Sequence, residues 1–181
     1  MSLEKANSID FSEFLVSEPY PEVTKGFLQD ELVFEIKRGF AGKESELTSV
    51  TQYIYQYFLL FKDNLTDNIG KNLQIISGHE TIHFEILAKK LSYAGVDPKL
   101  CRFVDKNPNI CDYWSGQNIN YVKELTNMMI SNIKLEEGAI EAYNWMLSVT
   151  TDDNLKELVT RILKDEHSHM EYFKAVLEAL N

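Results

Sequence analysis

Apolar residues recur every three or four positions in four long stretches of this chain, which is the spacing of one face of an α-helix. We predict helices over roughly 43–62, 67–94, 117–149 and 153–179. A longer first helix would have to run through Gly39 and Gly42, which weaken it. Alternating runs closed by Asn-Gly or Asp-Gly are missing, so no β-strands are expected. Helix-breaking proline leaves 22–97 and 109–181 free, because it occurs only at Pro19, Pro21, Pro98 and Pro108.

The predicted connections between these helices are short, long and short. The long one joins the second and third helices through about 22 residues, enough to run the length of a bundle. This pattern is typical of an all-α four-helix bundle with one crossover between helices 2 and 3. We assign residues 26–181 to the bundle and residues 1–25 to an N-terminal extension.

Two carboxylate–imidazole pairs interrupt the apolar stripes of the second and fourth helices. Glu80 precedes His83 by three positions, and Glu166 precedes His169 by three, so each pair points to one side of its helix. At 100° per residue, both glutamates lie in the middle of their apolar stripes. Burying such polar pairs is costly, and a bound metal would compensate for it.

The first and third helices each offer one further carboxylate in the apolar stripe, Glu46 and Glu136. The neighbouring Glu137 lies about 100° from Glu136 and is expected to face solvent, although a one-residue error would exchange the two. A tyrosine follows each of the in-stripe glutamates after seven residues, Tyr53 and Tyr143. The chain therefore consists of two similar halves, each with a Glu and a Tyr on one helix and Glu-x-x-His on the next.

Four carboxylates and two imidazoles form a ligand set for two divalent metal ions, iron or manganese. We predict Glu80 and Glu166 as bridging ligands, and the tyrosines as hydrogen-bond partners of ligand carboxylates. His79 is an alternative ligand at the edge of its stripe, and His167 is expected to be exposed. The terminal ligands are then Glu46, His83, Glu136 and His169.

These six residues resemble the signature of the ferritin-like di-metal carboxylate proteins, which is one Glu from each of two helices and Glu-x-x-His from each of the other two. The stretch from Ser45 to Tyr53 resembles the first metal helix of bacterioferritins and rubrerythrin-like proteins. The stretch from Asp112 to Tyr121 resembles the manganese-catalase-like and spore-coat-type branch.

The resemblance implies a di-iron or di-manganese oxidoreductase, with all six residues in the catalytic centre, that acts on hydrogen peroxide or O2. A rubrerythrin-like peroxidase would need an external electron-donor protein, because this chain lacks the four cysteines of a rubredoxin iron site. Two alternatives are a ferroxidase and iron-storage protein of the bacterioferritin type, and a metal-stapled structural protein of the spore-coat type.

Composition narrows the setting of this chemistry. The net charge of −10 argues against nucleic acid as a partner, and the longest apolar runs are too short to span a membrane. No signal peptide opens the sequence, so we expect a cytoplasmic protein in which Cys101 and Cys111 are reduced, with a disulfide as the alternative. A second apolar row on the second helix, Ile75, Ile82 and Ile86, predicts packing against the N-terminal arm or against a second subunit in a homodimer.

Overall fold

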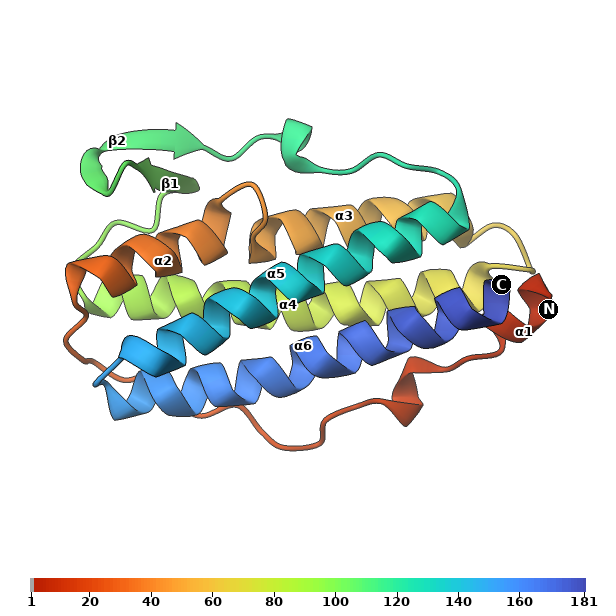
Figure 1. Ribbon diagram of the computed structural model, residues 1–181, viewed down its shortest axis with the longest axis horizontal. Helices are drawn as coiled ribbons and strands as arrows, with labels where there is room; N and C mark the ends of the chain where they lie inside the picture. The colour runs from red at the N-terminus through yellow and green to blue at the C-terminus, as the bar shows by residue number, and fades with distance from the viewer. Residues whose placement is uncertain (1) are drawn as a thin grey trace.

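The computed structural model describes residues 2–181 and confirms the predicted four-helix bundle (Figure 1). The helices are α3 (Glu46–Leu60), α4 (Asp67–Tyr93), α5 (Leu125–Val149) and α6 (Asp153–Leu180). Short loops join α3 to α4 and α5 to α6, and the long crossover joins α4 to α5. Within the described residues, no helix is long and apolar enough to cross a membrane.

One predicted helix boundary is wrong, and one further helix was not predicted. The helix expected from about 117 begins only at Leu125, because the Glu124 carboxylate caps it by accepting from the backbone N–H groups of Thr126 and Asn127. A separate helix, α2 (Asp30–Ala41), precedes α3. The α2 helix ends before Gly42, where a Cβ atom would lie 2.5 Å from the carbonyl oxygen of Arg38. The 3-10 turn η2 (Gly116–Asn118) occupies part of the region before α5.

The crossover contains an antiparallel hairpin of β1 (Cys101–Val104) and β2 (Asn107–Tyr113), so the expectation of no strands is also wrong. Its two turn residues, Asp105 and Lys106, have φ values of 48° and 59°. Such a turn usually contains glycine, and this turn has none, so the sequence carries no glycine signal for the hairpin. The hairpin lies beside α2 at one end of the bundle (Figure 1).

The N-terminal segment forms a strap that runs along α6 (Figure 1). The strap begins with α1 (Leu3–Asn7) and η1 (Phe11–Glu13) and continues as extended chain. Side chains of α6 satisfy its backbone: Ser168 donates to the Phe14 carbonyl oxygen, and Arg161 donates to that of Glu18, both at 2.5 Å. Beyond the strap, Ile86 of the predicted apolar row is buried, whereas Ile75 and Ile82 remain exposed by 46% and 39%.

The core consists of two apolar clusters separated by a polar layer. On α4, one cluster takes Ile69, Leu73 and Ile76, and the other takes Ile86, Leu87 and Leu91. On α6, residues 155–163 belong to one cluster and residues 172–179 to the other. The layer between them contains the Glu-x-x-His sequences of both helices, which places the polar groups at mid-height of the bundle.

Candidate metal centre

The structure brings all six predicted site residues together in the polar layer. They form two overlapping groups, Glu46, Glu80, His83 and Glu166 in one, and Glu80, Glu136, Glu166 and His169 in the other. Within each group, one ligand atom from every residue lies within 4.8 Å of the others. All six side chains are buried, with at most 4% of their surface exposed.

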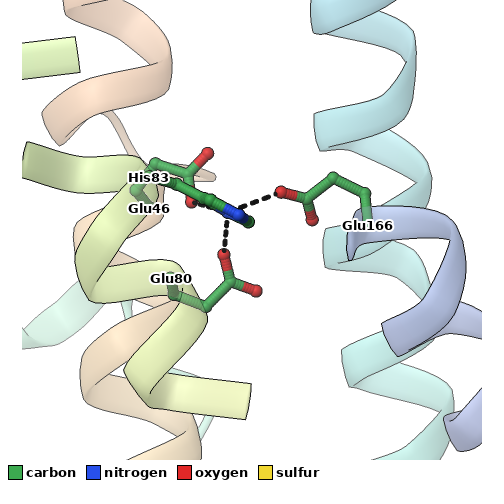
Figure 2. A group of neighbouring side chains, drawn as sticks. All are labelled: Glu46, Glu80, His83 and Glu166. Atoms are coloured by element: carbon green, nitrogen blue, oxygen red, sulfur yellow. Dashed lines mark hydrogen bonds and ion pairs between the residues drawn. The ribbon is translucent and has the colours of Figure 1, made fainter. Parts of the chain in front are cut away.

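Three carboxylates surround the Nδ1 atom of His83 (Figure 2). Glu166 Oε1 lies 2.9 Å from it, Glu80 Oε2 3.1 Å and Glu46 Oε2 3.6 Å. These side chains come from α6, α4 and α3, so the group holds three helices together at one point.

The Nδ1 atom of His169 has a matching environment. Glu80 Oε1 lies 3.2 Å from it, Glu136 Oε2 3.6 Å and Glu166 Oε2 3.8 Å. Glu80 and Glu166 therefore face both imidazoles, each with a different oxygen, whereas Glu46 faces only His83 and Glu136 faces only His169.

The protons of the metal-free cluster divide between its members. Burial raises the pKa of Glu46 and Glu136 well above the usual value, and the charges of Glu80 and Glu166 raise it further. Burial acts the same way on Glu80 and Glu166, but the two imidazoles outweigh it and hold the pKa of both carboxyls low, that of Glu166 at about 2.

In the metal-free state, the surroundings of both histidines of the cluster favour the charged form. Burial alone would lower the pKa of His83 and His169, but the facing carboxylates raise it well above the usual range. These directions correspond to two carboxylates, two imidazolium ions and two neutral carboxyl groups, a distribution of protons with zero net charge.

Each tyrosine of the repeat bonds to the terminal glutamate of the opposite half. The Tyr53 hydroxyl on α3 donates to Glu136 Oε1 on α5, and the Tyr143 hydroxyl on α5 donates to Glu46 Oε1 on α3. Burial and the neighbouring glutamate raise the pKa of both phenols, so they remain protonated donors. The sequence predicted from helical angles that both tyrosines would reach a ligand carboxylate, and the structure agrees. Each hydrogen bond joins one half of the sequence repeat to the other half.

A network of hydrogen bonds and an ion pair behind His83 was not predicted from the sequence. Asp165 Oδ2 accepts from His83 Nε2 at 3.1 Å and from the Tyr20 hydroxyl at 2.5 Å, and it pairs with Arg161 at 2.7 Å. Burial would raise the pKa of Asp165, but these partners hold it at about 2. The i, i+4 spacing of Arg161 and Asp165 is the only sequence signal, because Tyr20 comes from the distant strap.

The back of His169 meets a different partner. His79 Nδ1 lies 3.1 Å from His169 Nε2, and the Phe11 ring lies 5.6 Å from both imidazoles. Burial, together with the charge of His169, lowers the pKa of His79 to about 4, so it accepts this hydrogen bond as a neutral ring. His79 thus lies behind the other helix's histidine, not beside His83 as a further ligand, while Glu137 and His167 are exposed as expected.

The donor atoms of the cluster fit metal ions. Among the described residues, Glu80 Oε1, Glu166 Oε1 and His169 Nδ1 are buried without a hydrogen-bond partner. Glu80 Oε1 lies within ion-pair distance of His169 Nδ1, and Glu166 Oε1 within ion-pair distance of His83 Nδ1. Buried polar atoms are rarely left in this state, and metal coordination would satisfy them. Mixed carboxylate and imidazole donors suit iron and manganese.

A cavity of about 310 Å3 leads to the cluster from the side of α2, α3 and α5. Glu46 and Tyr143 line its inner part, and small residues of α5, including Gly138 and Ala142, provide the space. Glu44 also lines it and is exposed, so the entrance carries negative charge.

The bundle and its buried carboxylate–histidine cluster define a protein of the di-metal carboxylate type. Residues 10–179 match the family model of the ferritin-like domain, and the chain belongs to this family. No protein of curated function matches the sequence.

Solved structures of this family share the fold at low sequence identity. The manganese catalase KatB from Anabaena superposes with a TM-score of 0.72 at 20% identity, covering 91% of this chain and 78% of that one. Bacterioferritin from Desulfovibrio desulfuricans, described with a di-iron site, gives a TM-score of 0.64 at 19% identity over 82% and 78%. A dodecameric thioferritin from Bacteroides fragilis gives 0.64 at 16% over 83% and 87%.

Proposed function

We propose that this protein is a di-iron or di-manganese oxidoreductase that acts on hydrogen peroxide or O2. The observation that carries the proposal is the position of Glu80 and Glu166, each of which presents one oxygen to the His83 side and the other to the His169 side. Glu80 and Glu166 would therefore contribute a ligand to each of two metal ions. Glu46 with His83, and Glu136 with His169, would complete the two sites.

Two redox-active metal ions held by these residues would supply the two electrons that reduce peroxide, or would take up two electrons from it. The remaining chemistry belongs to the chain. Tyr53 and Tyr143 orient the terminal carboxylates, and Asp165 and His79 fix the rings of the two ligand histidines from behind. The two apolar clusters exclude water, and the narrow cavity beside Glu46 admits small molecules.

The comparisons support this proposal without choosing the metal. One structural neighbour is described as a manganese catalase and another as a bacterioferritin with a di-iron site. Six oxygen and nitrogen ligands of this kind accept both metals, so supply in the cell decides between them.

Peroxide consumption by the metal-loaded protein tests the proposal. We expect manganese- or iron-loaded protein to remove hydrogen peroxide, with O2 release in a catalase-like reaction and with a need for an added electron donor in a peroxidase-like one. Glu80→Ala should abolish the activity, while Glu137→Ala, on the exposed neighbouring face, should retain it. Loaded protein that neither consumes peroxide nor changes oxidation state on exposure to it or to O2 would show that the metals are structural.

The iron-storage alternative is separated by particle size. A hollow shell that holds mineral has a mass of hundreds of kilodaltons, whereas a dimer of this 20.9 kDa chain has about twice the chain mass. We propose the dimer, because Ile75 and Ile82 leave apolar surface exposed on α4. Sedimentation that finds only monomer would exclude it, and a shell with rapid Fe2+ oxidation would favour storage.

A further inference from the structure

The hairpin of the crossover places the chain's two cysteines together, away from the metal centre. Phe103 pairs with Cys111 across the hairpin, and Cys101 lies two residues before Phe103 on the same face of β1. Cys101 and Cys111 are therefore diagonal neighbours on one face, and their Sγ atoms lie 2.7 Å apart. Both are free thiols. Forming a bond between them needs little movement of the backbone.

The two thiols differ in their access to solvent. Cys101 is fully buried, whereas Cys111 is half-buried. Both line a cavity of about 870 Å3 between the hairpin, α2 and the end of α4, which also contains Phe27 and Tyr93. This volume is within the range of small-molecule sites. None of the six cluster residues lines this cavity, and of its two cysteines Cys111 is the less buried.

A buried cation completes the arrangement. Lys37 of α2 is fully buried, and its ammonium group donates to the carbonyl oxygens of Asp97 at 3.2 Å and Lys99 at 2.7 Å. Burial lowers the pKa of Lys37, while the two cysteine sulfurs favour its charged form. A cation beside thiols stabilises the thiolate, which is the reactive form.

The hydrogen bond between the sulfurs gives them different roles. Burial, aided by the contact with Cys111, raises the pKa of the Cys101 thiol to about 11. Cys101 therefore keeps its proton and donates it to the Cys111 sulfur. The accessible sulfur is thus the one that reacts first, and the buried thiol lies in position to react second.

We propose that Cys101 and Cys111 form a reversible thiol–disulfide couple, which exchanges two electrons with a small disulfide bound in this cavity. The Cys111 thiolate attacks one sulfur of the incoming disulfide, whose S–S bond breaks, and the leaving sulfur takes up the proton that Cys111 lost. Cys101 then attacks the Cys111 sulfur, the mixed S–S bond breaks, and the second leaving sulfur takes up the Cys101 proton. Two protein thiols are oxidised and one small disulfide is reduced to two thiols.

Titration of the full chain with glutathione buffers tests the couple. With rising glutathione disulfide, we expect both thiols to disappear together from alkylation mapped by mass spectrometry, and excess reduced glutathione to restore both. In Cys101→Ser the reaction should stop at a glutathione adduct on Cys111. In Cys111→Ser the buried Cys101 should react at least roughly tenfold more slowly. Bound metal should not change these results, because the cavity shares no residue with the metal cluster.

Two outcomes would overturn the proposal. One is wild-type protein in which both thiols stay open to alkylation at every ratio of glutathione disulfide to glutathione. The other is a Cys111→Ser variant that forms the adduct as fast as Cys101→Ser, since the roles derived from burial would then be wrong. The wild-type titration needs no variant, so it decides the question even where a serine disturbs the hairpin. Peroxidase or catalase assays do not enter either outcome, which keeps this test separate from that of the metal centre.

Discussion

Loading the cluster with metal should exchange protons for metal ions in a fixed ratio. In the metal-free state, the raised pKa values of Glu46, Glu136, His83 and His169 keep one dissociable proton on each of these groups. Metal ligation requires carboxylates and neutral imidazoles, so all four protons must leave. Two divalent cations then replace four protons, and the net charge of the cluster stays at zero.

The size of the effect follows from this count. Each released proton makes the binding free energy change by about 1.4 kcal/mol per pH unit. Four protons therefore change the combined binding free energy of the two metals by up to about 5.5 kcal/mol per pH unit. The sign is fixed by the raised pKa values: binding tightens as pH rises, and the dependence weakens once pH exceeds the pKa of each group in the metal-free protein.

Base uptake at constant pH measures the exchange directly. Titration of the metal-free protein with Mn2+ in a pH-stat should require close to two equivalents of base per metal ion at mildly acidic pH, and fewer as pH rises. Glu136→Gln should release one proton fewer, because glutamine imitates the neutral carboxyl group. The matched variant Glu137→Gln, at an exposed position, should leave the count unchanged.

A release near zero, or an affinity that does not change with pH, would refute this reasoning. Either result would mean that the metal-free cluster holds its ligands already deprotonated. The four buried carboxylates would then carry a net negative charge among themselves, contrary to the shared protons inferred from their burial and mutual repulsion.

Three further predictions concern single side chains. Tyr53→Phe removes a hydrogen bond to Glu136 and should lower the free energy of unfolding by about 1 kcal/mol, measured in denaturant. It should also weaken metal binding by roughly 10–100-fold, measured by chelator competition. Equal metal affinity would contradict the role of the phenol. Glu80→Gln removes a carboxylate between two imidazolium ions, so the free energy of unfolding of the metal-free protein, measured in urea, should fall by about 3–5 kcal/mol. A smaller loss than for Tyr53→Phe would show that these rings are uncharged. Gly138→Leu fills the cavity beside Glu46 while favouring the helix, so metal uptake in stopped-flow should slow without a fall in melting temperature; unchanged uptake would indicate another route.

The bundle was predictable because its helices each bury one stripe. The 3.6-residue period of the apolar residues predicted each stripe. The lengths of the loops, two short and one long, predicted which helices are neighbours in the bundle. The convergence of the six cluster residues followed from the same period, since a charged residue in the middle of an apolar stripe must be buried with partners. The choice of Glu136 over Glu137 agrees with the structure, where the first is 1% exposed and the second faces solvent.

The parts that the sequence did not reveal depend on contacts between distant segments. Asp165 lies outside the main stripe of α6, where a helix with one buried face would expose it. It is buried because the strap covers a second face of that helix. The spacing of residues 1–25 does not predict that the strap packs there. The hairpin was missed for a local reason, because its turn uses Asp105 and Lys106 at positions where glycine is the usual signal.

The strap has a consequence for the order in which the protein is made. Its Tyr20 and Phe11 are synthesised before the four helices of the bundle, yet their partners Asp165 and His169 lie on α6. During translation these aromatic side chains therefore wait without their native contacts until α6 has left the ribosome. The metal ligands wait as well, because Glu166 follows Glu46 by 120 residues. The complete set of metal ligands therefore exists only after α6 has been synthesised, and the strap closes over a site that a much later segment completes.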